Sequence, residues 1–259
     1  MEPIISIKNL SKNFRNGSVE KQVIKNLSLD IEKGKVIGYI GPNGAGKSTT
    51  VKILCGIIDD FKGEVEMFGK PVGADIIEVK KRIGYIPENG ALYETLTPIE
   101  FLSFIASLHD ISKEEADKKI NSFLSFFDML EHAHQRMNTF SKGMKQKILI
   151  ISGLIHNPEI IFMDEPLSGL DANAVLLVKE LINSMVKEGK TVFYCSHLMD
   201  VVEKMSDEIV MINDGNIIAQ GDCKDLLKQE EVDSLEVLFA KLTGNTEQKE
   251  RVSKFVESY

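Results

Sequence analysis

The loop Gly41-Pro42-Asn43-Gly44-Ala45-Gly46-Lys47-Ser48 follows the apolar run Val36–Ile40 and decides the fold of this chain. It fits the pattern GxxxxGKS/T, in which glycines let backbone N–H groups turn toward phosphate oxygens. A helix that begins at this loop adds the positive end of its dipole. We therefore expect Lys47 to reach the phosphates of a nucleotide and Ser48 to bind Mg²⁺, with Gly41 to Thr49 around the nucleotide. The plainer interpretation is a glycine-rich turn without a ligand.

Two acids after a second apolar run carry the chemistry. Ile160-Ile161-Phe162-Met163 is followed by Asp164 and Glu165. A buried strand would deliver both carboxylates to its C-terminal end, where α/β sheets bind their ligands. Asp164 is expected to hold Mg²⁺ through water, and Glu165 to polarise an attacking water as general base. Alone such a pair is typical of a turn or helix cap, but the loop at 41–48 favours the functional interpretation.

The surrounding pattern alternates strands and helices around a helical block. Strands are expected at 4–7, 27–31, 36–40, 64–68, 83–86 and 191–194, and a helix at 172–187. Residues 97–157 look helical: Thr97 and Glu100 form a capping box, and Ser112 caps a second helix. Phe101, Leu102, Phe104, Ile105 and Leu108 fall on one helical face. This order predicts an α/β protein with a parallel sheet and a helical insertion.

The bulk composition excludes several classes of protein. The chain has 259 residues, 43% of them hydrophobic and 27% charged, which is ordinary for a globular protein. A formal net charge of −8 repels phosphate backbones, so we expect no nucleic acid partner. Cys55, Cys195 and Cys223 form no CxxC pair, which argues against a disulfide framework or a zinc site. We see no signal peptide and no apolar stretch near the roughly 18 residues needed to span a bilayer.

Four further motifs, in the right order, make the chain resemble ATP-binding cassette (ABC) ATPase subunits over residues 4–243. Ser141-Lys142-Gly143-Met144-Lys145-Gln146 is similar to the family signature, and Ser168-Gly169-Leu170-Asp171 to the D-loop. His197 follows the expected strand at the position of the switch histidine. Phe14 stands where the family stacks an aromatic ring on adenine. The resemblance implies binding and hydrolysis of ATP with Mg²⁺.

The resemblance also implies a role for each of these residues. Two such domains pair head to tail on binding ATP, so Ser141 and Gly143 would contact the γ-phosphate of the nucleotide in the other subunit. His197 would bond the γ-phosphate, and Asp171 would link the two sites. For Asp171 an N-cap, for His197 a plain helix start, and for Phe14 simple packing remain open as alternatives.

The chain departs from the family pattern at two places. Glu88 follows Pro87 where the family usually has Gln, which adds a negative charge beside the γ-phosphate although its oxygen can still bind Mg²⁺. The signature reads Phe140-Ser141-Lys142-Gly143-Met144 where LSGGQ is typical. Because the phosphate-facing Ser and the second Gly are kept, binding should survive the second change.

These observations predict a P-loop NTPase of the α/β class, with a RecA-like core, an antiparallel β edge and an inserted helical subdomain. The ABC domain is expected at 1–243, with the core at 1–88 and 158–225, the lobe at 89–157 and an extension at 226–259.

The resemblance implies a motor subunit on the cytoplasmic face of the membrane, held there by a separate transmembrane permease. Its variants, including the segment from Ser234 to Phe239, are nearest to ABC-2 subunits that export drugs, antibiotics or peptides. The alternative is a soluble ABC ATPase with a non-transport partner.

Overall fold

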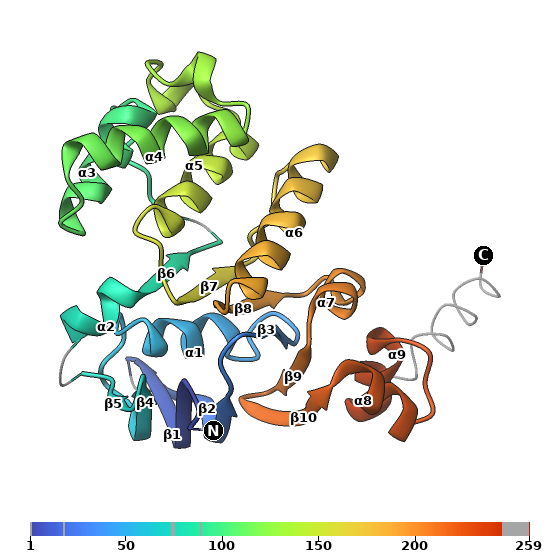
Figure 1. Cartoon of the computed structure of the whole chain (residues 1–259). Helices are drawn as coiled ribbons and strands as arrows, with labels where there is room; N and C mark the ends of the chain where they lie inside the picture. The colour runs from blue at the N-terminus through green and yellow to red at the C-terminus, as the bar shows by residue number, and fades with distance from the viewer. Residues whose placement is uncertain (1, 18, 74–75, 89, 245–258) are drawn as a thin grey trace.

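The computed structural model describes residues 2–17, 19–73, 76–88, 90–244 and 259. Figure 1 shows a core of strands and helices below a helical lobe that contains α3, α4 and α5. The helices of the core are α1 (Lys47–Leu54), α2 (Ile76–Arg82), α6 (Ala172–Lys187), α7 (Met199–Met205), α8 (Cys223–Gln229) and α9 (Leu235–Leu242).

A six-stranded sheet forms the centre of the core, in the order β10-β9-β3-β8-β7-β6. The pairs from β9 to β6 are parallel, and only β10 runs antiparallel, against β9. Strands β3, β7 and β8 are buried along their whole length, which explains why their sequences read as continuous apolar runs. The strands are β3 (Val36–Ile40), β6 (Ile83–Ile86), β7 (Ile160–Asp164), β8 (Thr191–Ser196), β9 (Glu208–Asn213) and β10 (Asn216–Asp222).

A four-stranded antiparallel sheet, β2-β1-β4-β5, forms the expected β edge. Its strands are β1 (Ile5–Asn16), β2 (Val19–Ile31), β4 (Lys62–Met67) and β5 (Lys70–Pro71). The predicted strands at 4–7 and 27–31 were too short, because β1 and β2 continue as a long hairpin. Its distal half is polar and largely exposed, with Asn13 donating to Glu20 across the strands at 2.8 Å. Such a stretch lacks the apolar signal on which the sequence prediction depended.

The helical lobe comprises α3 (Pro98–Leu108), α4 (Lys113–Phe126), two short 3₁₀ turns and α5 (Lys142–Leu154). Both predicted caps are confirmed: the Glu100 N–H donates to Thr97 Oγ1 at 3.3 Å while the Thr97 N–H donates to Glu100 Oε2 at 2.8 Å, and the Glu115 N–H donates to Ser112 Oγ at 3.3 Å. These bonds satisfy N–H groups that a helix leaves unpaired at its start.

The apolar stripe of α3 is only partly buried. Phe101 and Leu102 are buried, whereas Phe104 is 44% exposed and Leu108 is 60% exposed. Leu108 lies two turns after Phe101 on nearly the same face, at the last position of α3, so the stripe runs from the buried part of the helix to the surface.

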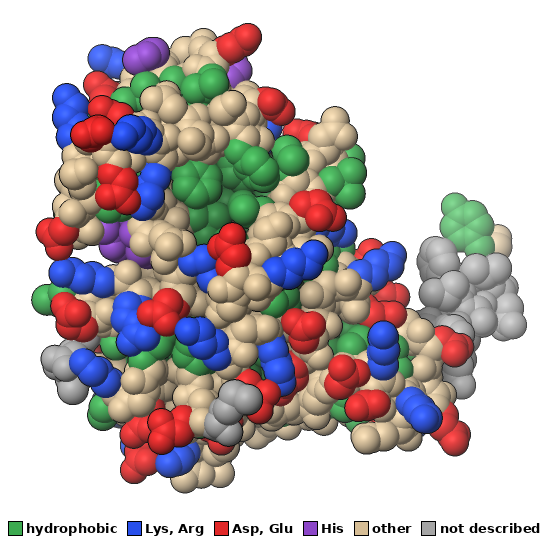
Figure 2. Space-filling view, in the orientation of Figure 1, with side chains coloured by type: hydrophobic (Ala, Val, Ile, Leu, Met, Phe, Trp, Pro, Cys, Tyr) green, Lys and Arg blue, Asp and Glu red, His purple; other side chains and the backbone are tan. Residues whose placement is uncertain are grey.

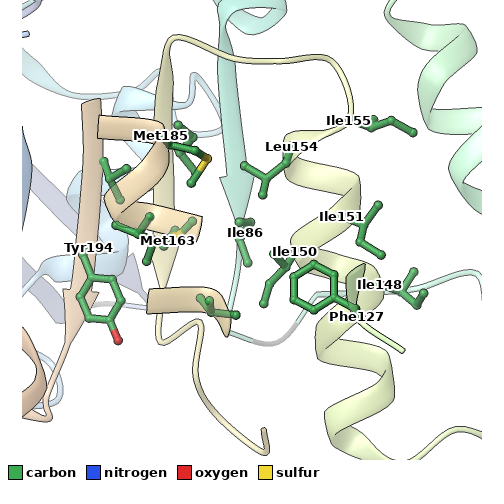
Figure 3. Packing of buried hydrophobic residues seen from close by; sticks show 14 of the residues in the cluster. Ile86, Phe127, Ile148, Ile150, Ile151, Leu154, Ile155, Met163, Met185 and Tyr194 are labelled. Atoms are coloured by element: carbon green, nitrogen blue, oxygen red, sulfur yellow. The ribbon is translucent and has the colours of Figure 1, made fainter. Parts of the chain in front are cut away.

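Helix α5 joins the lobe to the core. In Figure 3, Ile150 and Leu154 point from α5 toward Ile86 of β6, and Ile148 and Ile151 point to the opposite side of the helix. All four are at most 5% exposed. The helix therefore buries apolar residues on two sides. Because each Å² of buried apolar surface contributes about 25 cal/mol, this packing stabilises the junction between the lobe and the core.

After the core sheet, α9 packs on α7, and α8 packs on β10 and α9 (Figure 1). Helix α8 begins at Cys223, slightly before the expected extension at 226–259, and α9 starts at the cap Ser234. Residues 245–258 of that expected extension, and residue 89 at the start of the expected lobe, lie outside the described residues. The domain boundaries thus stay a prediction.

Candidate nucleotide-binding site

A cavity of about 280 Å³ opens at the C-terminal ends of β3, β7 and β8. It is lined by Val23, Asn43, Gly44, Gly46, Lys47, Ser48, Thr49, Glu88, Asp164, Glu165 and His197. Strands that lie side by side in one parallel sheet deliver these segments to a common edge, which is where α/β proteins bind ligands.

The loop before α1 presents backbone donors to this cavity. Gly44 and Gly46 have φ of +83° and +112°, a region open to glycine and costly for other residues. A Cβ at Gly46 would lie 3.0 Å from the Val23 carbonyl oxygen. Helix α1 has no side-chain cap and no acid in its first turn among the described residues. Its first N–H groups and its dipole therefore favour an anion.

Lys47 is only 7% exposed, although it carries a charge. Its ammonium donates to the carbonyl oxygens of Gly41 at 2.6 Å and Pro42 at 3.2 Å. These two bonds hold the ammonium against the backbone of the loop. Neutral carbonyls satisfy hydrogen bonds but not the charge, so the ammonium stays available to phosphate oxygens.

Asp164, the last residue of β7, and Glu165, just after it, lie at the C-terminal end of this buried strand, as the sequence predicted. Asp164 is 4% exposed and Glu165 is 9% exposed. Burial raises the pKa of Asp164, hydrogen bonding to the Ser48 hydroxyl opposes that rise, and the negative charges of Glu165 and Glu88 add to it. The cavity thus holds negative charge that a bound cation would offset.

Donors from the end of β8 hold the Glu165 carboxylate. Its Oε1 accepts the His197 N–H at 2.8 Å and faces His197 Nδ1 at 2.6 Å. Its Oε2 accepts the Ser196 hydroxyl at 2.9 Å. The Glu165 N–H itself donates to the Cys195 carbonyl at 2.9 Å. Both oxygens of the predicted base are therefore fixed by a neighbouring strand.

Some residues that were predicted to bind the nucleotide lie beside the cavity and do not line it. Gly41 and Pro42 accept from Lys47, and Ala45 is buried with its N–H donating to the Pro42 carbonyl at 3.2 Å. Phe14 is not among the lining residues either: it is 42% exposed on β1, with the ammonium of Lys12 4.9 Å from its ring centroid. Its predicted contact with adenine stays a prediction.

The signature residues lie apart from this cavity. Ser141 caps α5, accepting the Met144 N–H at 3.2 Å, and a Cβ at Gly143 would lie 2.5 Å from the Gly169 carbonyl oxygen. Asp171 caps α6, accepting the Ala174 N–H at 2.9 Å, and this bond lowers the pKa of Asp171. The capping role suggested for Asp171 is thus present, and neither Ser141, Gly143 nor Asp171 lines the nucleotide cavity of its own chain.

The sequence prediction missed two residues at the site. Val23 lines the cavity from β2, but a lone valine in a strand carries no motif signal. Ser196 is 1% exposed and bonds Glu165. The signal for Ser196 was available, because a polar residue ends the apolar run just before His197.

Known proteins are similar to this chain in sequence. A family profile described as ABC transporter matches residues 24–168. The ABC transporter ATP-binding protein NatA of Bacillus subtilis is 33% identical over 238 residues, covering 91% of this chain and 96% of NatA. The chain belongs to the ABC ATPases. The linearmycin resistance ATP-binding protein LnrL of the same organism is 36% identical, over 83% of this ABC ATPase and 70% of LnrL.

Solved structures agree with this assignment. A structure titled ATP binding subunit of ABC transporter superposes with a TM-score of 0.84 at 29% identity, over 93% of this ABC ATPase and 99% of that chain. The curated relatives differ in length: this chain spans 65% of one from Synechocystis and 96% of NatA. No helix in the described part of the chain combines the length and apolarity needed to cross a membrane.

Proposed function

We propose that this chain binds and hydrolyses ATP as the motor subunit of an ABC transporter of the exporter type. The observation that carries the proposal is the carboxylate of Glu165, which is held by Ser196 and His197 and lines one cavity with Lys47 and the start of α1. A cation and free N–H groups would hold the phosphates, while a fixed carboxylate faces the same space. In this arrangement Glu165 accepts a proton from the water that attacks the γ-phosphate.

Mg²⁺ fits the oxygen donors of the cavity. Asp164 and Glu88 offer carboxylates and Ser48 a hydroxyl, which are ligands that Mg²⁺ prefers. No group of three or more His, Cys, Asp or Glu side chains within the described ranges is arranged to hold a metal ion by itself. Mg²⁺ is commonly held by one or two carboxylates together with phosphate and water, and these donors allow such a site. Bound there, Mg²⁺ would neutralise phosphate charge.

The general base is tested by Glu165→Gln. We expect hydrolysis to slow by about 10²–10⁴-fold, because the amide cannot accept the proton. ATP binding should persist, and ATP with Mg²⁺ should trap a homodimer on size-exclusion chromatography. A solved relative at 26% identity is a dimeric cassette bound to ADP and phosphate, which supports this expectation. Glu180→Gln, at an exposed position on α6, is the control. A monomeric Glu165→Gln protein with wild-type turnover would defeat both claims.

A transmembrane permease is the proposed partner, and the exposed apolar side of α3 is the surface that fits it. Phe104, Leu108 and Tyr93 are 44%, 60% and 61% exposed, and Tyr93 meets Phe104 edge to face at 6.2 Å. Ile77 of α2 is exposed by 69% as well, and Figure 2 shows further apolar side chains gathered between the helical lobe and α6. Exposed apolar patches favour protein partners. The name of LnrL, which refers to linearmycin resistance, supports export as the direction.

Fractionation of cells tests the partner. Co-expressed with its permease, the chain should sediment with membranes, and Phe104→Ser with Leu108→Ser should release most of it. Val237→Ser on α9, also an exposed apolar site at 50%, is the matched control and should stay bound. If the wild-type chain stays soluble beside every permease candidate, a non-transport partner is the better hypothesis.

A further inference from the structure

The backbone at Glu165 adopts a conformation that few residues tolerate. Its φ is +50°, in the left-handed region, which costs a non-glycine residue on the order of 1 kcal/mol. Two backbone hydrogen bonds hold this conformation. The Glu165 N–H donates to the Cys195 carbonyl, and the Glu165 carbonyl accepts the Ser168 N–H at 3.1 Å. The backbone thus aims this side chain into the cavity. It does not fix the rotation of the carboxylate, which depends on side-chain partners.

The partners of the two carboxylate oxygens differ. Oε1 takes bonds from both the backbone and the ring of His197, whereas Oε2 accepts a single bond within the described part of the chain, from Ser196. The Ser196 hydroxyl has one hydrogen, and its oxygen already accepts the Leu198 N–H at 3.1 Å. The hydroxyl therefore donates to Glu165 and is itself oriented by Leu198.

Ser196 is well placed to act as a fixed donor. It is 1% exposed and ends β8, directly beside Ile40, the last residue of the strand that enters the phosphate loop. One step back on the same strand, Cys195 pairs with Asp164. Strand pairing thus fixes the position of the Ser196 hydroxyl relative to the strand before the phosphate loop and the strand that ends at the acids. A donor on this frame can hold Oε2 more closely than a side chain on a loop.

We propose that Ser196 is a positioning residue for hydrolysis: its buried hydroxyl fixes the rotation of the Glu165 carboxylate so that a lone pair faces the cavity. This deepens the proposed function and rests on Glu165 being the base. Without the hydroxyl, only the two bonds from His197 to Oε1 hold the carboxylate. It can then rotate about its last side-chain bond. A misplaced base slows the chemical step without weakening the hold on the nucleotide, because Lys47 and the start of α1 are untouched.

The test compares Ser196→Ala, Ser196→Thr and Thr191→Ala in the full chain, by single-turnover hydrolysis and ATP affinity. Thr191, at the other end of β8, is also fully buried, and its hydroxyl accepts the Gly34 N–H at 2.9 Å. It therefore controls for loss of a buried hydroxyl as such. Ser196→Ala should hydrolyse ATP about tenfold more slowly with an unchanged Kd. Ser196→Thr keeps the hydroxyl and should restore at least half of the rate, and Thr191→Ala should keep wild-type turnover.

Glu165→Gln supplies the second arm. If Ser196 acts through Glu165, Ser196→Ala should add no further loss in the Glu165→Gln background. An equal further loss there, a wild-type rate in Ser196→Ala, or a Ser196→Thr protein as slow as Ser196→Ala would each overturn the positioning role. Wild-type turnover by Glu165→Gln itself would overturn the general base and with it the proposed function. A slow Glu165→Gln beside a fast Ser196→Ala would remove only the inference about Ser196.

Discussion

Strand β6 runs between two polar clusters of opposite character. At its start, His156 donates from Nε2 to the Ile83 carbonyl at 2.8 Å and stacks on His109, with ring centroids 3.7 Å apart and planes 8° from parallel. Just past its end, Glu88 lines the nucleotide cavity with Asp164.

Burial acts in opposite ways on the charges of the two clusters. It lowers the pKa of His156 to about 4, so the stacked pair is kept neutral near pH 7. It raises the pKa of Asp164, yet this carboxylate lies with Lys47 in an open cavity where ligands can compensate it. A neutral, half-buried cluster marks a structural junction between lobe and core, whereas charged groups around an open cavity mark a binding site. Changes at the two ends should therefore affect different properties.

The largest effect on ATP affinity is expected at the cavity end, from Lys47→Ala. Loss of charge-assisted bonds of about 1.5–3 kcal/mol should weaken ATP binding by roughly 10- to 150-fold. The chain should still fold, because the lost protein contacts are bonds to the carbonyls of Gly41 and Pro42. Titration calorimetry measures the affinity. Lys52→Ala, an exposed lysine on the same helix, is the control and should bind normally. Normal affinity in Lys47→Ala would contradict the site.

Most of the core of this site could be predicted from sequence, because its residues are local in the chain. The loop from Gly41 to Ser48 and the pair Asp164-Glu165 each follow a buried strand, and parallel strands deliver their C-terminal ends to one edge. Strand and loop are adjacent in sequence, so periodicity and motif together place the side chains. In the fold, residues of both segments line one cavity.

The remaining features depend on partners that sequence does not display. Ser196 contacts Glu165 across 31 residues, and Val23 reaches the cavity from the antiparallel sheet. The outer half of the β1–β2 hairpin is polar, so no apolar alternation marked it. The exposure of Phe104 and Leu108 could not be foreseen either, since an apolar stripe looks alike whether it meets a core or an external partner.

A smaller effect is expected at the other end of β6, in the dependence of stability on pH. His156 has a folded pKa of about 4 against an ordinary value of 6.5, so the unfolded chain takes up a proton first as pH falls. Its stabilising contribution is complete above pH 6.5 and is lost from there toward pH 4. Lys119 and Lys190 add to the depression of its pKa, and Asp110 and Lys81 act on the adjacent His109.

His156→Gln removes this titration. Between pH 7 and pH 4.5 the wild type should lose up to about 2 kcal/mol more unfolding free energy than the variant, after allowance for partial exposure. Urea unfolding followed at several pH values gives the difference. His134→Gln, at an exposed position in the lobe, should retain the wild-type pH profile, and ATP affinity at pH 7 should be unaffected in both. Equal pH profiles for His156→Gln and wild type would show that the junction is not kept neutral by burial.

The smallest effect is expected from Glu88→Gln, which restores the residue usual in the family. Glu88 is one of the carboxylates that raise the pKa of Asp164, and the change removes its charge from the cavity while keeping an oxygen ligand. Because Glu88 is exposed and solvent screens it, the apparent affinity for ATP should stay equal or improve by no more than about threefold. Hydrolysis should persist, since Asp164, Ser48 and Glu165 still line the cavity. Steady-state turnover over a range of ATP concentrations measures both quantities, with Glu94→Gln in the lobe as the control. Complete loss of turnover in Glu88→Gln would make Glu88 an essential catalytic carboxylate. Hydrolysis would then depend on the charge of a third carboxylate in the cavity, beside those of Asp164 and Glu165.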